Sequence, residues 1–186
     1  MKYKTLYIDP PWNEHGGGKI KRGADRHYPL MKTSDIIAME PFITSLMDEN
    51  SHIYMWVTNN FLQDGFRVLD AWGYRYITKI TWVKEGKPGL GQYFRGMSED
   101  CLFAVKGKVP YKVLNGKRQQ GLTAFSAPRR EHSAKPEQMR RMIEKVSFPP
   151  FVEVFARPKE QEDIFASDTP KVEWHYIGNQ ADGTVF

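Results

Sequence analysis

The chain has 186 residues, of which 40% are apolar and 13% aromatic, a balance typical of a globular domain rather than of a disordered or fibrous chain. We expect a single domain over residues 1–186, because domains commonly hold about 100 to 200 residues. The sequence has no long apolar run and no signal-peptide core, so we expect a cytoplasmic protein without membrane contact. The single cysteine, Cys101, excludes a disulfide framework; we expect it to be a packed apolar residue, and we expect no metal site.

The net charge of +5 is unevenly distributed. Residues 1–74 carry 8 basic and 9 acidic side chains, residues 75–145 carry 16 and 6, and residues 146–186 carry 3 and 7. A basic middle segment of this kind is typical of nucleic-acid-binding proteins. The side chains expected to contact phosphates are Lys19 and Arg22 in the glycine-rich loop 13–27, and Lys84, Lys87, Arg95, Lys106, Lys108, Lys112, Lys117, Arg118, Arg129 and Arg130.

Strands and helices are predicted to alternate in the first part of the chain. Residues 4–9 form an apolar run ended by two prolines, which predicts a buried strand with Asp9 at its carboxyl end. The elements predicted next are a short helix over 33–40, a strand over 52–58, a helix capped by Asn59 and stopped by Gly73, and strands over 74–83 and 101–105.

The second half is less regular, because residues 106–134 are polar, basic and without periodicity. Pro136 precedes a predicted helix over 137–146, and further strands are predicted over 151–156 and 174–177. Strands that alternate with helices indicate a three-layer α/β fold around a mostly parallel sheet. Ligands of such sheets bind beyond the carboxyl ends of the strands, where we expect Asp9 and the residues after Glu153.

The segment Asp9-Pro10-Pro11-Trp12 has the groups needed to hold a planar base with an exocyclic amine. The Asp9 carboxylate and the Pro10 carbonyl would each accept one amine hydrogen, and Trp12 would pack on the base. Two such acceptors orient the nitrogen lone pair toward an electrophile, so the motif indicates methyl transfer to an amino group. The alternative is an ordinary turn at a strand end.

Ten short segments resemble the MT-A70 family of N6-adenine methyltransferases, which includes the catalytic subunit of the eukaryotic messenger-RNA methylase and many bacterial and phage DNA methylases. The resemblance covers nearly all of residues 3–186 and implies a Rossmann-like domain with S-adenosyl-L-methionine as cofactor. The segments are Asp9-Pro10-Pro11-Trp12, Tyr28-Pro29-Leu30-Met31, Trp56-Val57-Thr58, Trp72-Gly73-Tyr74, Trp82-Val83-Lys84, Glu99-Asp100-Cys101-Leu102, Lys106-Gly107, His132-Ser133-Ala134-Lys135-Pro136, Glu153-Val154-Phe155-Ala156-Arg157 and Gly178-Asn179-Gln180.

The resemblance also implies roles for individual residues. Lys135 would pair with the cofactor carboxylate, and Glu153 would bind ribose hydroxyls unless a structural partner satisfies it. The adenine pocket would be lined by Tyr28, Glu99 and His132. The cofactor contacts would come from Asp9, Lys135, Glu153, Arg157, Asn179 and Gln180.

The base must leave its stack to reach Asp9, either by flipping from a duplex or by starting single-stranded. The compact chain is similar to the small DNA methylases of bacteria and phages, so we expect methylation of adenine in DNA, with RNA as the alternative. A catalytically inactive nucleic-acid-binding scaffold and a methyltransferase of a small-molecule or protein amine are two further hypotheses. The intact tetrapeptide argues against the first, and the basic middle segment argues against the second. A homodimer would suit a compact enzyme that grips a long substrate.

Overall fold

A computed structural model describes residues 1–13, 30–89, 91, 93–130, 134–156, 172–178 and 183. Helices and strands alternate over the first part of the described chain, up to residue 85, as predicted. The elements in order are β1 (Tyr3–Ile8), α1 (Thr33–Ala38), α2 (Glu40–Leu46), β2 (Met47–Val57), the 3₁₀ helix η2 (Asn59–Phe61), α3 (Leu62–Ala71), β3 (Arg75–Glu85), β4 (Ser98–Lys106), β5 (Val113–Leu114), β6 (Lys117–Arg118), β7 (Ala124–Pro128), α4 (Glu137–Val146), β8 (Phe151–Val154) and β9 (Trp174–Ile177).

The described residues form a seven-stranded sheet in the order β7-β3-β4-β2-β1-β8-β9. β1 pairs in parallel with β2 and β8, β9 pairs in parallel with β8, and β7 pairs in parallel with β3. β4 alone runs antiparallel to its neighbours β2 and β3 among these described strands. The sheet is therefore mostly parallel, which confirms the predicted fold class.

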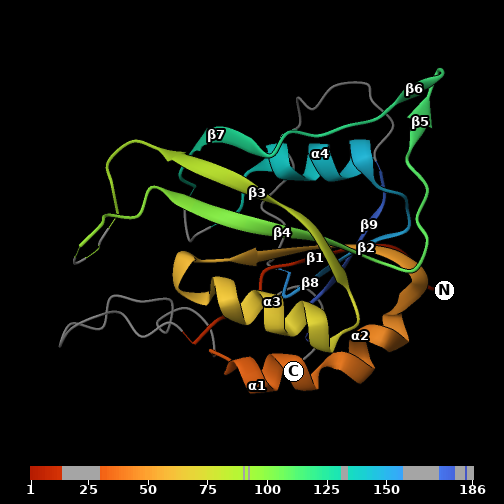
Figure 1. Ribbon diagram of the computed structural model, residues 1–186, viewed down its shortest axis with the longest axis horizontal. Helices are drawn as coiled ribbons and strands as arrows, with labels where there is room; N and C mark the ends of the chain where they lie inside the picture. Colours follow the sequence, from red (N-terminus) through yellow and green to blue (C-terminus); the bar gives the residue numbers. More distant parts are fainter. Residues whose placement is uncertain are drawn as a thin grey trace.

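Helices cover both faces of the sheet, as Figure 1 shows: α1, α2 and α3 lie on one face and α4 lies on the other. Side chains alternate along β1 accordingly, because successive residues of a strand point to opposite faces. Leu6 and Ile8 pack in the core beneath α1–α3, and Tyr7 packs in the core beneath α4. Among the helices that the structure describes, none has the length and apolarity to span a bilayer.

Several strands differ from the prediction for identifiable reasons. β2 begins at Met47 rather than at residue 52, because Met47 pairs with Tyr3 of β1. The polar residues 48–51, which precede the apolar run of β2, show no strand pattern in the sequence. β7 lies at the sheet edge within the segment expected to be irregular. The β5–β6 hairpin lies in the same segment, and its Asn115-Gly116 turn, with both residues at positive φ, is a hairpin signal that the prediction missed.

Cys101 is fully buried, as predicted, and its surroundings are those of a packed apolar side chain. Burial raises the pKa of its thiol well above the ordinary value, and the nearby carboxylate of Asp9 raises the pKa further. Such a thiol stays protonated at neutral pH, and a protonated thiol is a poor nucleophile.

Gly65 lets α3 approach the sheet closely. A Cβ atom at this position would lie 2.6 Å from Val57 Cγ1 and 2.9 Å from Leu102 Cδ1. We expect Gly65→Ala to lower the free energy of unfolding by about 1–3 kcal/mol, because overpacking against stiff strand residues exceeds the gain in helix propensity. Urea denaturation measures this change, and Gln63→Ala on the exposed side of α3 is the control. Equal stability of the two variants would contradict the prediction.

His52 predicts a pH dependence of stability. Its Nδ1 lies 2.8 Å from Ser147 Oγ, and burial lowers its pKa to about 4. The unfolded chain therefore binds a proton that the folded protein excludes, so stability should fall as the pH drops from about 6.5 toward 4, by up to ~3 kcal/mol. Urea denaturation at several pH values tests this, and His52→Asn should flatten that part of the profile. A profile that the substitution leaves unchanged would contradict the assignment.

Candidate active site

Asp9 lies where the connections of the sheet diverge. The chain that leaves β1 leads to β2 on one side, whereas the chain that leaves the adjacent strand β8 leads to β9 on the other. In open α/β sheets, ligands bind beyond the carboxyl ends of the strands at such a switch point. Asp9 follows β1 directly and its side chain remains partly exposed, so its carboxylate is available at this edge.

The two prolines after Asp9 fix the turn that carries the carboxylate. The Trp12 amide donates to the Pro10 carbonyl at 2.8 Å, and the Met31 amide donates to the Pro11 carbonyl at 2.8 Å. A carbonyl oxygen has two lone pairs, so Pro10 retains one acceptor position for a ligand. The prolines have no amide hydrogen and a fixed φ, and they hold this turn in place.

Trp12 has a different role from the one predicted. Its ring is 5% exposed, lies in the core beneath α1–α3 and stacks on Phe61 with a centroid distance of 5.4 Å. Its indole N–H donates to the carbonyl of Trp56 at 3.0 Å. With one face against Phe61 and the ring buried, Trp12 anchors the turn after β1 to the end of β2. The expectation that this ring packs on the substrate base is therefore corrected.

Lys135 lies just before α4 and binds the Asp9 carboxylate. Its Nζ is 2.7 Å from Asp9 Oδ2 and 3.4 Å from Glu99 Oε2, and it also lies over the Trp56 ring. The side chain is largely buried, so the ion pair is stronger than an exposed one. The structure thus brings together Asp9, Glu99 and Lys135, three predicted site residues from distant parts of the chain.

Glu99 connects this group to β3. Its second neighbour is the ammonium group of Lys84, which forms an ion pair with Glu99 Oε1. Burial alone would raise the pKa of Glu99, but Lys135 and Lys84 together lower it below the ordinary value. Glu99 is consequently ionised at neutral pH, and the site is a chain of alternating charges from Lys84 through Glu99 and Lys135 to Asp9.

This pairing corrects the role expected of Lys84, which is a neighbour of the site rather than a phosphate contact. Two further lysines from the same prediction are engaged within the protein. Lys106 Nζ donates to the Trp72 carbonyl, and Lys112 Nζ donates to the carbonyls of Glu144 and Ser147. The pairing of Lys84 with Glu99 depends on the register of β3 and β4, which the local sequence does not reveal.

Glu153 has a structural partner, which was one of the two alternatives for this residue. The Arg140 guanidinium of α4 forms an ion pair with its carboxylate and also donates to Tyr176 Oη at 2.7 Å. Burial by itself lowers the pKa of Arg140, but Glu153 and Tyr176 raise it above the ordinary value. Arg140 was not among the predicted site residues, because its position facing β8 follows only from the packing of α4.

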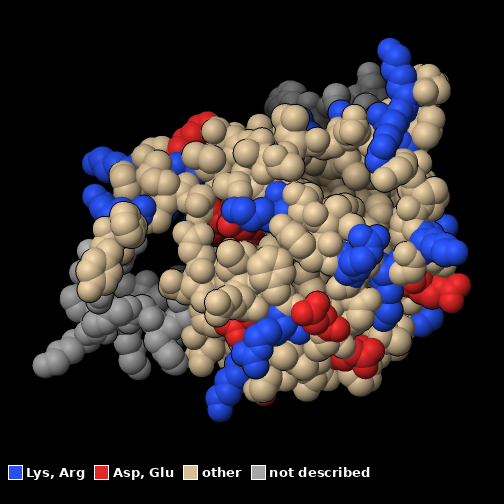
Figure 2. Space-filling view, viewed as in Figure 1, with Lys and Arg blue, Asp and Glu red and all other residues tan. Residues whose placement is uncertain are grey.

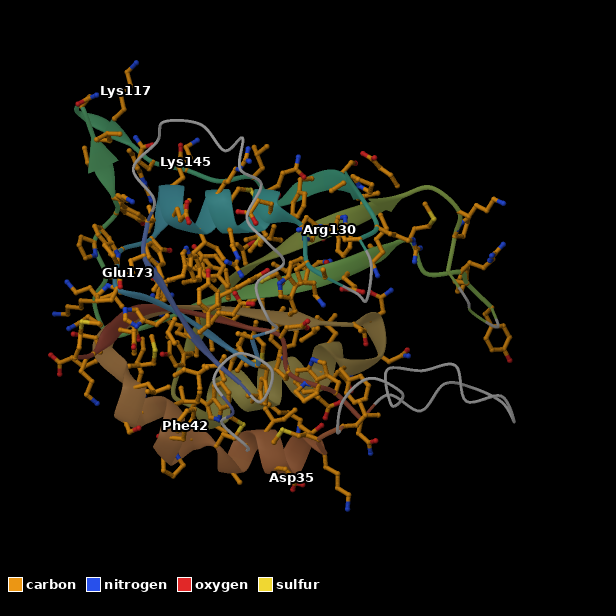
Figure 3. The ribbon with its side chains drawn as sticks, turned by 180° about the vertical axis from the view of Figure 1, so that it is seen from behind. Asp35, Phe42, Lys117, Arg130, Lys145 and Glu173 are labelled. Carbon is orange, nitrogen blue, oxygen red and sulfur yellow. The ribbon has the colours of Figure 1, made fainter. Side chains whose placement is uncertain are left out.

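The remaining predicted residues divide into two groups. Arg129 is exposed beyond the end of β7 and its guanidinium donates to the Gly96 carbonyl at 3.3 Å. Figure 3, which views the molecule from behind, shows Arg130 near the start of α4. The predictions that lie outside the described residues are those for Lys19, Arg22, Tyr28, His132, Arg157, Asn179 and Gln180.

The described residues fit a methionine-derived cofactor. Lys135 places a largely buried ammonium group beside Asp9, and this group complements the carboxylate of an amino acid. Thr58 Oγ1, just after the carboxyl end of the neighbouring strand β2, is buried and has no hydrogen-bond partner among the described residues. Such a buried hydroxyl is costly unless a further group satisfies it.

Comparison with known proteins finds relatives that match nearly the whole chain. The human N(6)-adenosine-methyltransferase catalytic subunit METTL3 is 26% identical over 192 residues, which cover 98% of this chain and 29% of the human protein. A Drosophila melanogaster N(6)-adenosine-methyltransferase MT-A70-like protein is 26% identical over 190 residues, which cover 98% of this chain and 27% of the relative. The Arabidopsis thaliana N6-adenosine-methyltransferase non-catalytic subunit MTB is 29% identical over 119 residues, which cover 58% and 15% respectively.

This chain spans less than a third of the length of each of these relatives. The match nevertheless extends over almost the whole chain, because the model of the MT-A70 family covers residues 3–180. That range includes the turn after β1, the ion pair of Asp9 and Lys135 and the switch point of the sheet. This chain belongs to the MT-A70 family of S-adenosyl-L-methionine-dependent methyltransferases.

Proposed function

We propose that this chain transfers a methyl group from S-adenosyl-L-methionine to the 6-amino group of adenine in RNA. The observation that carries the proposal is the position of Asp9, whose carboxylate stands at the switch point of the sheet on a turn fixed by two prolines. A carboxylate and a proline carbonyl at the same point are the two acceptors that an exocyclic amine requires.

When bound, S-adenosyl-L-methionine supplies the methyl group as an electrophile on a sulfonium. Asp9 holds one amine hydrogen: Lys135 occupies its Oδ2 atom, and Oδ1 is the oxygen left for the substrate. The Pro10 carbonyl accepts the other amine hydrogen through its second lone pair. Together they orient the nitrogen lone pair, so the chain catalyses by positioning and electrostatics and needs no covalent intermediate.

The comparisons favour RNA over the DNA substrate that we expected from the compactness of the chain. The relatives described above are named for N(6)-adenosine and come from animals and plants, and they give no support to a bacterial or phage DNA methylase. The shared requirement of both substrates is an unstacked adenine at Asp9. RNA offers such bases in loops and single-stranded regions without the cost of opening a duplex.

The proposal is tested by transfer of labelled methyl from S-adenosyl-L-methionine to single-stranded RNA, single-stranded DNA, duplex DNA and adenine-free controls, followed by nucleoside analysis. We expect label in RNA, recovered as N6-methyladenosine. Label in DNA alone would retain the chemistry and reverse the substrate. Absence of label from every adenine-containing substrate would contradict the proposed activity.

An inactive scaffold is the second candidate, because one relative is named a non-catalytic subunit. The intact pair of Asp9 and Lys135 favours catalysis over this alternative, since a scaffold does not require a carboxylate that binds the amino group of adenine. The same assay separates the two functions. A scaffold would bind RNA in a filter-binding measurement and would transfer no label.

A further inference from the structure

The loop between β3 and β4 presents two aromatic rings to solvent. It extends past the carboxyl ends of β1 and β2 (Figure 1), the end of the sheet at which Asp9 follows β1. Tyr93 and Phe94 are neighbours in this loop, and each is 92% exposed. Burial of large aromatic side chains normally stabilises a protein, and these two adjacent rings are not buried. Exposed apolar groups of this kind are typical of surfaces that bind a partner.

The stem of this loop is held by hydrogen bonds. The Gly89 amide donates to the Gly96 carbonyl at 2.9 Å, and the Lys84 amide donates to the Met97 carbonyl at 2.7 Å. The Arg95 guanidinium closes the turn by donating to the carbonyls of Pro88 and Gly89. The backbone on both sides of the segment that carries the two rings is therefore held by hydrogen bonds within the loop stem.

The charge of this loop suits a polyanion. Residues 86–97 include Lys87 and Arg95 and no acidic residue. Arg129 adds a third cation, because its guanidinium contacts the Gly96 carbonyl. Figure 2 shows basic side chains on the lobe at the left of the view, where the loop protrudes, with uncharged residues at its tip. An aromatic tip within a basic surround is the arrangement that binds bases and phosphates of a single strand.

The root of the loop is joined to the proposed active site. Lys84, at the end of β3, pairs with Glu99 of β4, and Glu99 contacts Lys135, which binds Asp9. A nucleotide whose base reaches Asp9 therefore lies beside the strands that support the loop. The neighbouring nucleotides of the same strand would then have to pass beyond the carboxyl ends of these strands, where the loop that carries Tyr93 and Phe94 extends.

We propose that Tyr93 and Phe94 form a stacking platform for unpaired bases that flank the target adenine, so that the substrate is single-stranded at this point. The inference rests on the proposed function and specifies the form of its substrate. An aromatic face stacks on any base, so the platform would bind single strands with little dependence on their sequence. A duplex keeps its bases stacked on one another and gains little from such a platform.

The platform is tested by the affinity of the full chain for a fluorescent single strand of RNA of about twelve nucleotides and for the matching duplex. Tyr93→Ala combined with Phe94→Ala should weaken binding to the single strand at least ~10-fold and leave binding to the duplex nearly unchanged. Tyr93→Trp combined with Phe94→Trp should restore the affinity, because the ring and not the hydroxyl binds the base.

Tyr111→Ala is the matched control. Tyr111 is also an exposed aromatic residue, 69% accessible, and the Arg118 guanidinium lies over its ring. It precedes the β5–β6 hairpin, whose tip, marked by Lys117 in Figure 3, projects from the opposite end of the sheet. We expect this variant to bind the single strand as the unmodified protein does. Equal weakening by Tyr111→Ala, equal loss of duplex binding, or unchanged binding by the alanine double variant would overturn the platform.

The binding result is independent of catalysis, so the two proposals fail separately. If no substrate is methylated but the alanine double variant loses single-strand affinity, the proposed activity fails and the platform stands. A protein-docking role is a different outcome. Light scattering would then show a change in oligomeric state in the alanine double variant, RNA affinity would stay constant, and the platform would be overturned.

Discussion

Asp9→Ala should reduce methyl transfer to RNA by at least ~100-fold, because it removes the carboxylate that holds and orients the reacting amine. The fold should survive this change. Asp9 is partly exposed, and Lys135 keeps Glu99 as a partner at 3.4 Å, so no buried charge is left without a counter-charge. Initial rates of label transfer at saturating cofactor measure the effect, and thermal unfolding measures stability.

Asp64→Ala is a suitable control for this experiment, because Asp64 is a carboxylate on α3 that forms an ion pair with the exposed Arg67. Removal of such a surface pair costs little. The control should therefore retain both activity and stability. Full activity of Asp9→Ala would overturn the assignment of Asp9 as the group that holds the amine.

Trp12→Ala should have the largest effect on stability, lowering the free energy of unfolding by about 3–5 kcal/mol. The substitution removes a ring that is 5% exposed and stacked on Phe61, and it leaves the Trp56 carbonyl without the indole N–H. Loss of activity should follow from loss of the fold, because the turn that carries Asp9 is no longer anchored. Urea denaturation followed by circular dichroism measures the change.

Trp12→Phe separates packing from hydrogen bonding. Phenylalanine keeps most of the contact with Phe61 and cannot donate to Trp56, so we expect a smaller loss of about 1–3 kcal/mol. This variant should retain measurable activity at a temperature where it is folded. If Trp12→Ala instead unfolds like the unmodified protein and loses activity, the ring acts on the substrate and not on the core.

Local pattern was sufficient for the elements that have strong periodicity or clear end signals. The helix predicted after Pro136 and the strand over 174–177 match α4 and β9 in both bounds. The buried strand before Asp9 was also correct, because an apolar run stopped by two prolines has few other conformations. Weak local signals failed at β7, whose pairing with β3 joins segments some forty residues apart.

The sequence alone also identified the family and indicated the chemistry proposed for the site. Asp9-Pro10-Pro11-Trp12 indicated an amine-binding acceptor pair, and ten matching segments identified the MT-A70 family, which the family model confirms. Tertiary structure alone decided which side chains face one another. The tertiary structure stacks the buried Trp12 ring on Phe61, and it forms the ion pairs of Lys84 with Glu99 and of Arg140 with Glu153. These contacts depend on strand order, register and helix packing, which are non-local, whereas a motif reports only the residues beside it in the chain.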